Sequence, residues 1–356
     1  MAELVVMLAS AGRRPYLARW FRRALEVNGI AGRVIVADAD GLAPARSVAD
    51  EFVDAPRVTD PGYADWLRRV LIGRRVDIAL SVNDFELSAW SRLDADDPDF
   101  ARLIRLDPSV QDLVEDKLAM ASVFASAGIP VPATVCASEF TGRSDTEIVV
   151  KGRYGSGSRG LALVRAGDLD RVLERVKAEV TERDGTLPAD GTVLDAIAVQ
   201  PRVRGEEFGL DVVCDLDGRF ATVLARRKVA MRYGETDRAV TVDPTPFLEL
   251  GRRIAGLMRH RGTIDVDVIR AEDGGLWVID VNPRFGGGYP FSHLAGADIP
   301  AAYVAWASGR PMNTDWLSAR EGVTAAKYVD TAIVPVGPAD TPSGSADNLW
   351  TVAGRN

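Results

Sequence analysis

The stretch IVVKGRYGSGSRG, residues 148–160, carries a lysine at the end of an apolar run and then continues as a loop of glycine and serine. Glycine lets backbone N–H groups approach phosphate oxygens, and serine hydroxyls add further donors. Lys151 precedes the glycines, whereas in the common phosphate loop the lysine follows them. The stretch therefore predicts a strand-borne cation beneath a phosphate-binding flap. A mobile hairpin with a surface lysine is the alternative.

A second stretch, TIDVDVIRAEDGGLWVIDVNPRFGGG at 263–288, predicts a hairpin of two alternating strands around an acidic turn. Asp280 and Asn282 are two positions apart and share one strand face, and the turn brings Asp267 alongside them. Oxygen donors of this kind suit Mg²⁺. Arg284 and a run of glycines follow directly, in position to cover a terminal phosphate. The alternative is a pair of solvated acids on an exposed sheet face.

Two further stretches are candidates for contact with substrates. The strand VQPRVRGEEF, residues 199–208, offers Gln200 to a purine edge and Glu207 to ribose hydroxyls, although a plain exposed strand is the better explanation of this stretch on its own. The basic stretch at 226–242 carries arginines that would grip a carboxylate bidentately, and its Glu235 would hold an amino group. An exposed, arginine-rich hairpin is the alternative. The arginines in question are Arg226, Arg232 and Arg238.

Composition limits the class of protein. The chain has 356 residues, 47% hydrophobic and 26% charged, which is typical of a soluble globular protein of two or three domains. Its net charge of −8 argues against a nucleic-acid binder. No apolar run reaches the roughly 20 residues of a membrane helix, and the start lacks the basic region of a signal peptide. With only two cysteines, we expect a reduced, cytoplasmic protein.

The N-terminal part alternates between strand and helix patterns. Residues 4–84 predict a small parallel sheet covered by helices, and Arg13, Asp84 and Glu86 follow the ends of its strands, where ligands bind in such sheets. The first turn lacks G-x-G-x-x-G, so a nicotinamide site is not supported. Farther along, residues 110–132 predict one amphipathic helix ended by glycine and proline.

Five strings in this order resemble the ATP-grasp superfamily: EDKLAMASVFASAGIPVP, IVVKGRYGSGSRG, VQPRVRGEEFGLDVV, IDVDVI and VIDVNPRFGGGYPFSHLAGADIP. With the opening LASAGRR, they look closest to short, single-unit relatives of the carbamoyl-phosphate synthase large chain. The resemblance covers roughly residues 1–310 and implies an α/β and α+β fold, in which a Rossmann-like parallel sheet precedes a two-subdomain ATP-grasp fold. The implied domains are a pre-ATP-grasp domain at 1–108, an A subdomain with the flap at 109–192, a B subdomain with the metal hairpin at 193–315 and a C-terminal tail at 316–356.

The resemblance also implies a site between the two subdomains, which requires the flap and the 267–282 hairpin to share one cleft. Its metal would be Mg²⁺, with two ions expected and Mn²⁺ as a substitute. The family's commonest residue at position 280 is Glu, whereas this chain has Asp. The implied ATP contacts are Lys117, Lys151, Gly155, Ser156, Gly157, Ser158, Gln200, Arg202, Val203 and Glu207. The implied metal ligands are Asp267, Asp280 and Asn282, the catalytic residues Arg284 and Lys151, and the substrate contacts Arg226, Arg232, Glu235, Arg238, Gly286 and Gly287.

The family's usual reaction joins a carboxylate to an amine. ATP converts the carboxylate into an acyl phosphate, which the amine attacks, with release of ADP and phosphate. We therefore expect a ligase that forms an amide or peptide bond between small molecules, with no nucleic-acid or membrane partner and with a homodimer allowed. A carbamate- or bicarbonate-phosphorylating enzyme is the first alternative, although the chain holds one ATP-grasp unit and no glutaminase. A non-catalytic ATP-binding regulatory module is the second, which the intact lysines and metal positions argue against.

Overall fold

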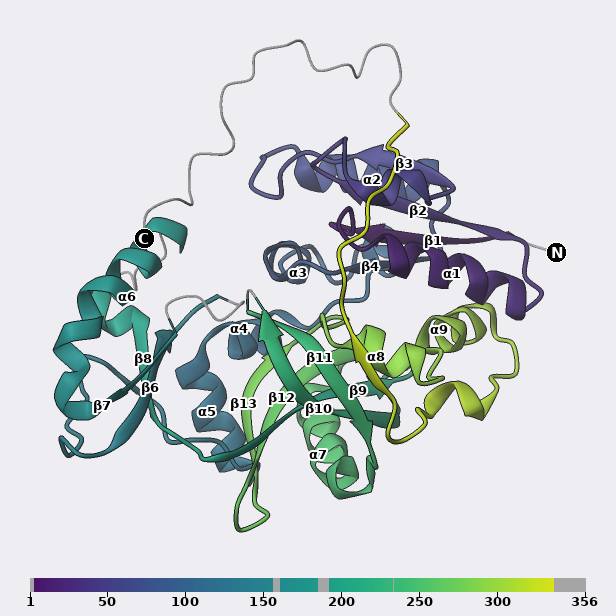
Figure 1. Cartoon of the computed structure of the whole chain (residues 1–356). Coiled ribbons are helices and arrows are strands. Elements are labelled where there is room, and N and C mark those ends of the chain that lie inside the picture. The colour runs from purple at the N-terminus through teal and green to yellow at the C-terminus, as the bar shows by residue number, and fades with distance from the viewer. Residues whose placement is uncertain (1–2, 156–160, 185–191, 233, 336–356) are drawn as a thin grey trace.

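The computed structural model describes residues 3–155, 161–184, 192–232 and 234–335 (Figure 1). The N-terminal domain is a parallel sheet of four strands in the order β3-β2-β1-β4. Every residue of β1 is buried, because α1 covers one face of the sheet and α2 the other. The elements are β1 (Leu4–Ala9), α1 (Pro15–Val27), β2 (Gly32–Asp38), β3 (Glu51–Asp54), α2 (Tyr63–Gly73), β4 (Ile78–Ser81) and α3 (Asp84–Ser91).

Two turns at the carboxyl edge of this sheet place side chains toward the rest of the molecule. Ser10 adopts a positive φ of 49° after β1, and the chain then enters α1 through Arg14, with Pro15 in the first helical turn. After β4, the Asn83 side chain accepts hydrogen bonds from the backbone N–H groups of Phe85 and Glu86 and so caps α3. That cap fixes Asp84 in the first turn of α3.

The A subdomain is a small antiparallel sheet in the order β5-β8-β6-β7. Alternation along β6 turns Ile148 and Val150 toward α6, where they form a core, and turns Lys151 to the opposite face. In Figure 1 this teal unit lies beside the six-stranded sheet, which is the central sheet of the molecule. Its elements are β5 (Val135–Cys136), β6 (Glu147–Gly152), β7 (Ala162–Arg165), α6 (Leu169–Asp184) and β8 (Ile197–Pro201).

The B subdomain is an antiparallel sheet of six strands in the order β13-β12-β9-β10-β11-β14. Apolar side chains on one face pack on α4, α5 and α7, while acidic side chains of β12 and β13 lie on the other face. The elements are α4 (Pro108–Glu115), α5 (Lys117–Ser126), β9 (Gly205–Cys214), β10 (Phe220–Arg232), β11 (Glu235–Val242), α7 (Leu248–Met258), β12 (Thr263–Ala271), β13 (Leu276–Asn282), α8 (Tyr289–Leu294), α9 (Ile299–Ser308) and β14 (Thr324–Ala326).

The N-terminal domain and the B subdomain share a core. Helix α9 packs on α1, and Phe21 of α1 meets Phe285 and Tyr303 edge to face. Residues from β9 and β10 join the same apolar cluster, so the first sheet is held firmly against the central one. Within the described part of the chain, every helix is too short or too polar to cross a membrane.

The expected fold class is confirmed, because a parallel N-terminal sheet precedes two further sheets. The predicted single helix at 110–132 is wrong. Asp116 is extended (φ −104°, ψ 105°) and separates α4 from α5, and its carboxylate caps α5 by accepting from the N–H groups of Leu118 and Ala119. The predicted domain boundaries stay predictions, although β8 of the expected B subdomain pairs with β6, α4 and α5 of the expected A subdomain pack on the six-stranded sheet, and Thr324–Ala326 of the expected tail forms β14 in that sheet.

Candidate active site

The flap strand and the acidic hairpin are in direct contact. Nζ of Lys151, on β6, donates a hydrogen bond of 3.0 Å to the backbone carbonyl of Ile279, on β13. Burial lowers the pKa of Lys151 to about 8, against the opposing effect of the nearby Asp280 carboxylate. The flap strand and the acidic hairpin therefore lie side by side, as the sequence requires, and a shared nucleotide cleft stays a prediction.

A second lysine reaches the base of the flap. Lys117 begins α5 with its side chain almost fully buried, and its Nζ donates to the carbonyl of Gly155 at 2.6 Å. Arg153 forms a bidentate ion pair with Asp116, at 2.8 and 2.6 Å, which ties the start of α5 to the end of β6. Gly155 has a φ of +84°, a conformation that favours glycine. The predicted contacts Ser156, Gly157 and Ser158 lie outside the described residues.

The strand register assembles the predicted metal ligands. Asp267 stands directly opposite Asp280 in the β12–β13 ladder, and Asn282 Nδ2 lies 3.4 Å from Asp280 Oδ2. Among the described residues, no group of three or more His, Cys, Asp or Glu side chains is arranged to hold a metal. The two carboxylates and one amide oxygen nevertheless suit Mg²⁺, which usually takes its remaining ligands from water and phosphate oxygens.

Sequence reasoning missed Lys228, whose ammonium lies between Asp267 and Glu207. Nζ of Lys228, on β10, is 2.7 Å from Asp267 Oδ1 and 2.7 Å from Glu207 Oε1. Burial alone would lower the pKa of Lys228, but the two carboxylates raise it well above its usual value. A signal was present, because Lys228 shares a strand face with Arg226 two positions earlier. The expected ribose contact, Glu207, is therefore already bound to a lysine.

Comparison with known families and structures identifies the fold. Residues 6–99 match a model described as the PylC-like N-terminal domain, and residues 194–331 match one described as ATP-grasp in the biosynthetic pathway with Ter operon. The ATP-grasp match covers residues 194–331, and the PylC-like match covers the N-terminal part before it. The family resemblance and the enzyme class expected from the sequence are confirmed. A search of curated proteins gives no match.

Solved ATP-grasp structures share the architecture at low sequence identity. The biotin carboxylase domain of Hydrogenobacter thermophilus 2-oxoglutarate carboxylase, in complex with MgADP and bicarbonate, has a TM-score of 0.66 at 17% identity, over 88% of this chain and 71% of that one. Staphylococcus aureus N5-carboxyaminoimidazole synthetase gives 0.63 at 15%, over 88% and 80%. Bacillus licheniformis L-amino acid ligase gives 0.61 at 15%, over 90% and 78%.

A cavity of about 200 Å³ opens beside the acidic hairpin of β12 and β13. The guanidinium of Arg284 forms a bidentate ion pair with Asp84 of the N-terminal domain, at 2.8 and 2.9 Å, and also donates to Asn282 Oδ1 at 3.2 Å. The N-terminal domain therefore contributes to the site. The lining residues are Arg14, Arg226, Lys228, Met231, Gly234, Glu235, Thr236, Asp265, Asp267, Asp280, Asn282, Arg284, Gly287 and Gly288.

Arg226 corrects the sequence expectation. Its side chain is 1% exposed, and its guanidinium contacts Asp211 Oδ2 at 2.5 Å and Asp265 Oδ1 at 2.7 Å. A Cβ atom on Gly288 would lie 2.2 Å from its Nε, and a Cβ on Gly286 would lie 2.2 Å from Asp265 Cγ. The glycine turn therefore lies directly on this buried cluster. Arg226 holds two carboxylates of the protein itself, so we reassign it from substrate binding to structure.

The other predicted substrate contacts divide between cavity and surface. Glu235 and Gly287 line the cavity, whereas Arg232 and Arg238 are exposed and do not line it. Their roles stay predictions. At the strand ends of the N-terminal domain, Arg13 is exposed, and its neighbour Arg14 lines the cavity in its place.

Glu86, which sequence reasoning placed in the same cleft, is buried inside the N-terminal domain. Its carboxylate accepts hydrogen bonds from the hydroxyls of Ser81 and Tyr63, at 2.5 and 2.6 Å. Trp90 in turn donates to the Tyr63 hydroxyl at 2.8 Å. Glu86 therefore belongs to a polar network in the core of that domain, and Asp84 alone of the two acids reaches the cavity through Arg284.

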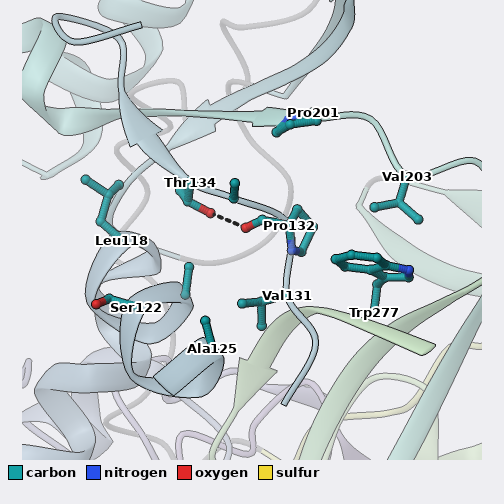
Figure 2. A pocket seen from close by; sticks show the side chains of 11 residues that line it. Leu118, Ser122, Ala125, Val131, Pro132, Thr134, Pro201, Val203 and Trp277 are labelled. Atoms are coloured by element: carbon teal, nitrogen blue, oxygen red, sulfur yellow. Dashed lines mark hydrogen bonds between the residues drawn. The ribbon is translucent and has the colours of Figure 1, made fainter. Parts of the chain in front are cut away.

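A larger apolar cavity, of about 570 Å³, lies beside the segment 201–204, which joins β8 to β9 and which we call the hinge (Figure 2). Val203 and Pro201 of the hinge border it together with Trp277 of β13 and the helix α5. Nε2 of Gln200 donates to the Thr134 hydroxyl at 2.7 Å. The Arg202 guanidinium lies 3.4 Å from a carboxylate oxygen of Glu147, on β6. The predicted adenine contacts thus gather at the hinge, and their binding role stays a prediction.

Proposed function

We propose that the enzyme is an ATP-dependent ligase that forms an amide or peptide bond between a small carboxylate and a small amine through an acyl phosphate. The contact between Lys151 Nζ and the Ile279 carbonyl carries the proposal, because it joins the flap strand to the acidic hairpin. A triphosphate in that cleft would lie between Lys151 and Lys117 on one side and the carboxylates of β12 and β13 on the other.

The first step transfers the γ-phosphoryl group. Asp267, Asp280 and Asn282 would hold Mg²⁺, which offsets phosphate charge when it is bound. Lys151 supplies a buried positive charge, and Arg284 is oriented toward the same face by its pair with Asp84. A carboxylate oxygen of the substrate bonds to the γ-phosphorus, the bond from that phosphorus to the β–γ bridging oxygen breaks, and ADP leaves.

The second step forms the amide. The nitrogen of a neutral amine attacks the acyl carbon, the C–N bond forms, the C–O bond to phosphate breaks, and the nitrogen loses a proton as phosphate leaves. No nucleophilic side chain is needed. His260 is buried and His293 is half-buried, and burial lowers the pKa of each to about 4, so neither is placed as a general base for this step.

ADP release tests the proposal. The purified enzyme is assayed with MgATP and pools of small carboxylates, pools of amines, and both together, with hydroxylamine added in parallel to trap any acyl phosphate as a hydroxamate. We expect release that depends on a carboxylate and an amine together. Bicarbonate-dependent release without an amine would favour the carbamate-type enzyme, and MgATP binding without any turnover would favour a regulatory module.

A matched pair of acidic variants separates a metal role from a general charge effect. Asp280→Ala should abolish ADP release, because it removes a metal-facing oxygen donor. Glu272→Ala, in the exposed turn of the same hairpin, should leave ADP release unchanged. Mn²⁺ substitution is tested by replacing Mg²⁺ in the same assay, and a homodimer by measuring the mass in solution. Cytoplasmic location also stays a prediction.

A further inference from the structure

The cavity beside the metal hairpin has a carboxylate whose partner is a lysine from the C-terminal segment. Nζ of Lys327 lies 2.7 Å from Glu235 Oε2. Lys327 follows β14, and its backbone N–H donates to the carbonyl of Asp237 at 2.8 Å, so the pairing of β14 with β11 delivers the ammonium to Glu235. An ammonium group of the protein thus pairs with a carboxylate of the cavity lining.

This ion pair lies beside the glycine turn that follows the predicted metal ligands. A Cβ atom on Gly287 would lie 3.1 Å from Glu235 Oε2 and 3.3 Å from Lys327 Nζ. Gly287 belongs to the turn that leaves the metal-ligand strand, three residues after Arg284. Burial alone would raise the pKa of Glu235, but Lys327, Arg14 and Arg284 lower it, so the carboxylate is anionic at neutral pH.

The same cavity also contains the guanidinium of Arg14, which contacts the glycine turn near its start. Nη1 of Arg14 donates to the carbonyl of Phe285 at 2.8 Å, one residue after Arg284, and Arg14 lines the cavity with Glu235. A guanidinium has five N–H donors in a fork that matches a carboxylate. Tyr16 lies beside it, and burial raises the pKa of its hydroxyl against the opposing charge of Arg14. The other cations of the lining, Arg226, Lys228 and Arg284, each pair with a carboxylate of the protein, so Arg14 and Glu235 are the cation and the anion that we assign to a ligand.

We propose that Glu235 and Arg14 form the amine-acceptor subsite and that the acceptor is an α-amino acid, whose carboxylate binds Arg14 and whose ammonium replaces Lys327 at Glu235 and then loses one proton to water before the neutral amine attacks. This inference rests on the proposed ligase function. A zwitterion matches both charges at once, whereas a simple amine leaves Arg14 unused. Lys327 marks the ammonium position in the unliganded enzyme and competes with the acceptor for it, so binding of the acceptor requires the segment after β14 to release Glu235.

The test compares two acceptor mixtures and four variants. The donor is the carboxylate that gives a hydroxamate in the screen above, and the acceptors are the twenty proteinogenic L-amino acids or their C-terminal amides. For each variant, acceptor-dependent ADP release is divided by hydroxamate formation. We expect the amino acids to act and the amides to act at least tenfold less well. Arg14→Gln and Glu235→Gln should each lower the ratio tenfold or more, and Arg14→Gln should also reduce the preference for acids over amides.

Lys327→Met should lower the KM for the acceptor several-fold, because it removes the internal competitor. Lys177→Met is its matched control: Lys177 also pairs with a glutamate at 2.8 Å, Glu174, but on the outer helix α6, and it should leave the acceptor KM unchanged. A purely structural Lys327–Glu235 pair would leave that KM unchanged in both variants. Such a result would overturn the competition by Lys327.

The remaining outcomes separate this subsite from the ligase function. Hydroxamate formation without any response to the amino acids would overturn the subsite and leave the ligase function standing. Equal action of acids and amides would overturn recognition by Arg14. The absence of carboxylate-dependent hydroxamate in the wild-type enzyme would overturn the ligase function and the subsite with it.

Discussion

Arg226→Met tests whether the buried arginine is structural. The substitution leaves Asp211 without its cation, and Asp211 is 0% exposed with Ser292 as its remaining side-chain donor. Removing one partner of a buried pair costs about 3–5 kcal/mol, a large fraction of the roughly 5–15 kcal/mol that stabilises a typical domain. With a urea m-value of about 3 kcal/mol/M, the unfolding midpoint should fall by roughly 1–1.7 M.

The assay follows tryptophan fluorescence during urea unfolding. Arg238→Met is the control, because its exposed side chain should change stability by no more than about 0.5 kcal/mol. Asp211→Asn added to Arg226→Met should restore part of the loss by removing the unpaired charge. The loss should also shrink as pH falls, because a protonated Asp211 needs no cation. An unchanged midpoint combined with a tenfold rise in a substrate KM would show that Arg226 binds substrate after all.

Three further predictions concern the cleft. Lys151→Ala and Asp280→Ala should each reduce ADP release by at least about 100-fold, since each removes transition-state charge stabilisation, with the circular dichroism spectrum unchanged. The pKa of Lys151 in the free enzyme is about 8, so this lysine loses its charge above pH 8. The affinity of the enzyme for MgATP should therefore be full below pH 8 and fall by up to about tenfold per pH unit above it, as measured by calorimetry. Asp84→Asn removes the bidentate partner of Arg284 and should lower kcat about tenfold or more, measured by ADP release.

Each of these has a contrary outcome. Normal turnover in either alanine variant would remove that residue from the site. An affinity for MgATP that stays constant from pH 7 to 9 in the wild-type enzyme would contradict a neutralising Lys151, and Lys151→Arg, which stays charged, supplies the flat reference profile. For Asp84→Asn, a fallen unfolding midpoint with normal kcat would mean that the pair with Arg284 joins the domains without orienting the arginine.

Local patterns predicted the elements whose causes are local. The N-terminal sheet follows from apolar runs alternating with helices, and the facing of Asp267 and Asp280 follows from the period of two and the position of the turn. The break at Asp116 was missed because a helical pattern runs through it, and only the cap that it gives α5 reveals the boundary. The role of Lys228 was missed because its partner Glu207 lies on a different strand.

Local sequence patterns could not predict which strand faces become buried. The alternation of β10 shows that Arg226 and Lys228 share a side, but it does not show that a glycine turn more than fifty residues later will cover one of them. For the same reason, sequence favoured Arg13 over Arg14: the choice depends on how the chain turns at Ser10, where φ is 49°. Contacts between distant segments decide such positions, and their sequence signal is weak.

The edge strand Thr324–Ala326 has a consequence for how such enzymes diversify. It is a three-residue addition to β11, on the opposite edge of the sheet from the acidic hairpin, yet the residue after it pairs with Glu235 of the cavity lining. Changes in this late segment can therefore alter the chemistry at the mouth of the pocket without disturbing the residues that handle the nucleotide. We expect that exchange of β14 and the residue after it between related chains changes the substrate preference and leaves the proposed phosphoryl-transfer residues unaltered.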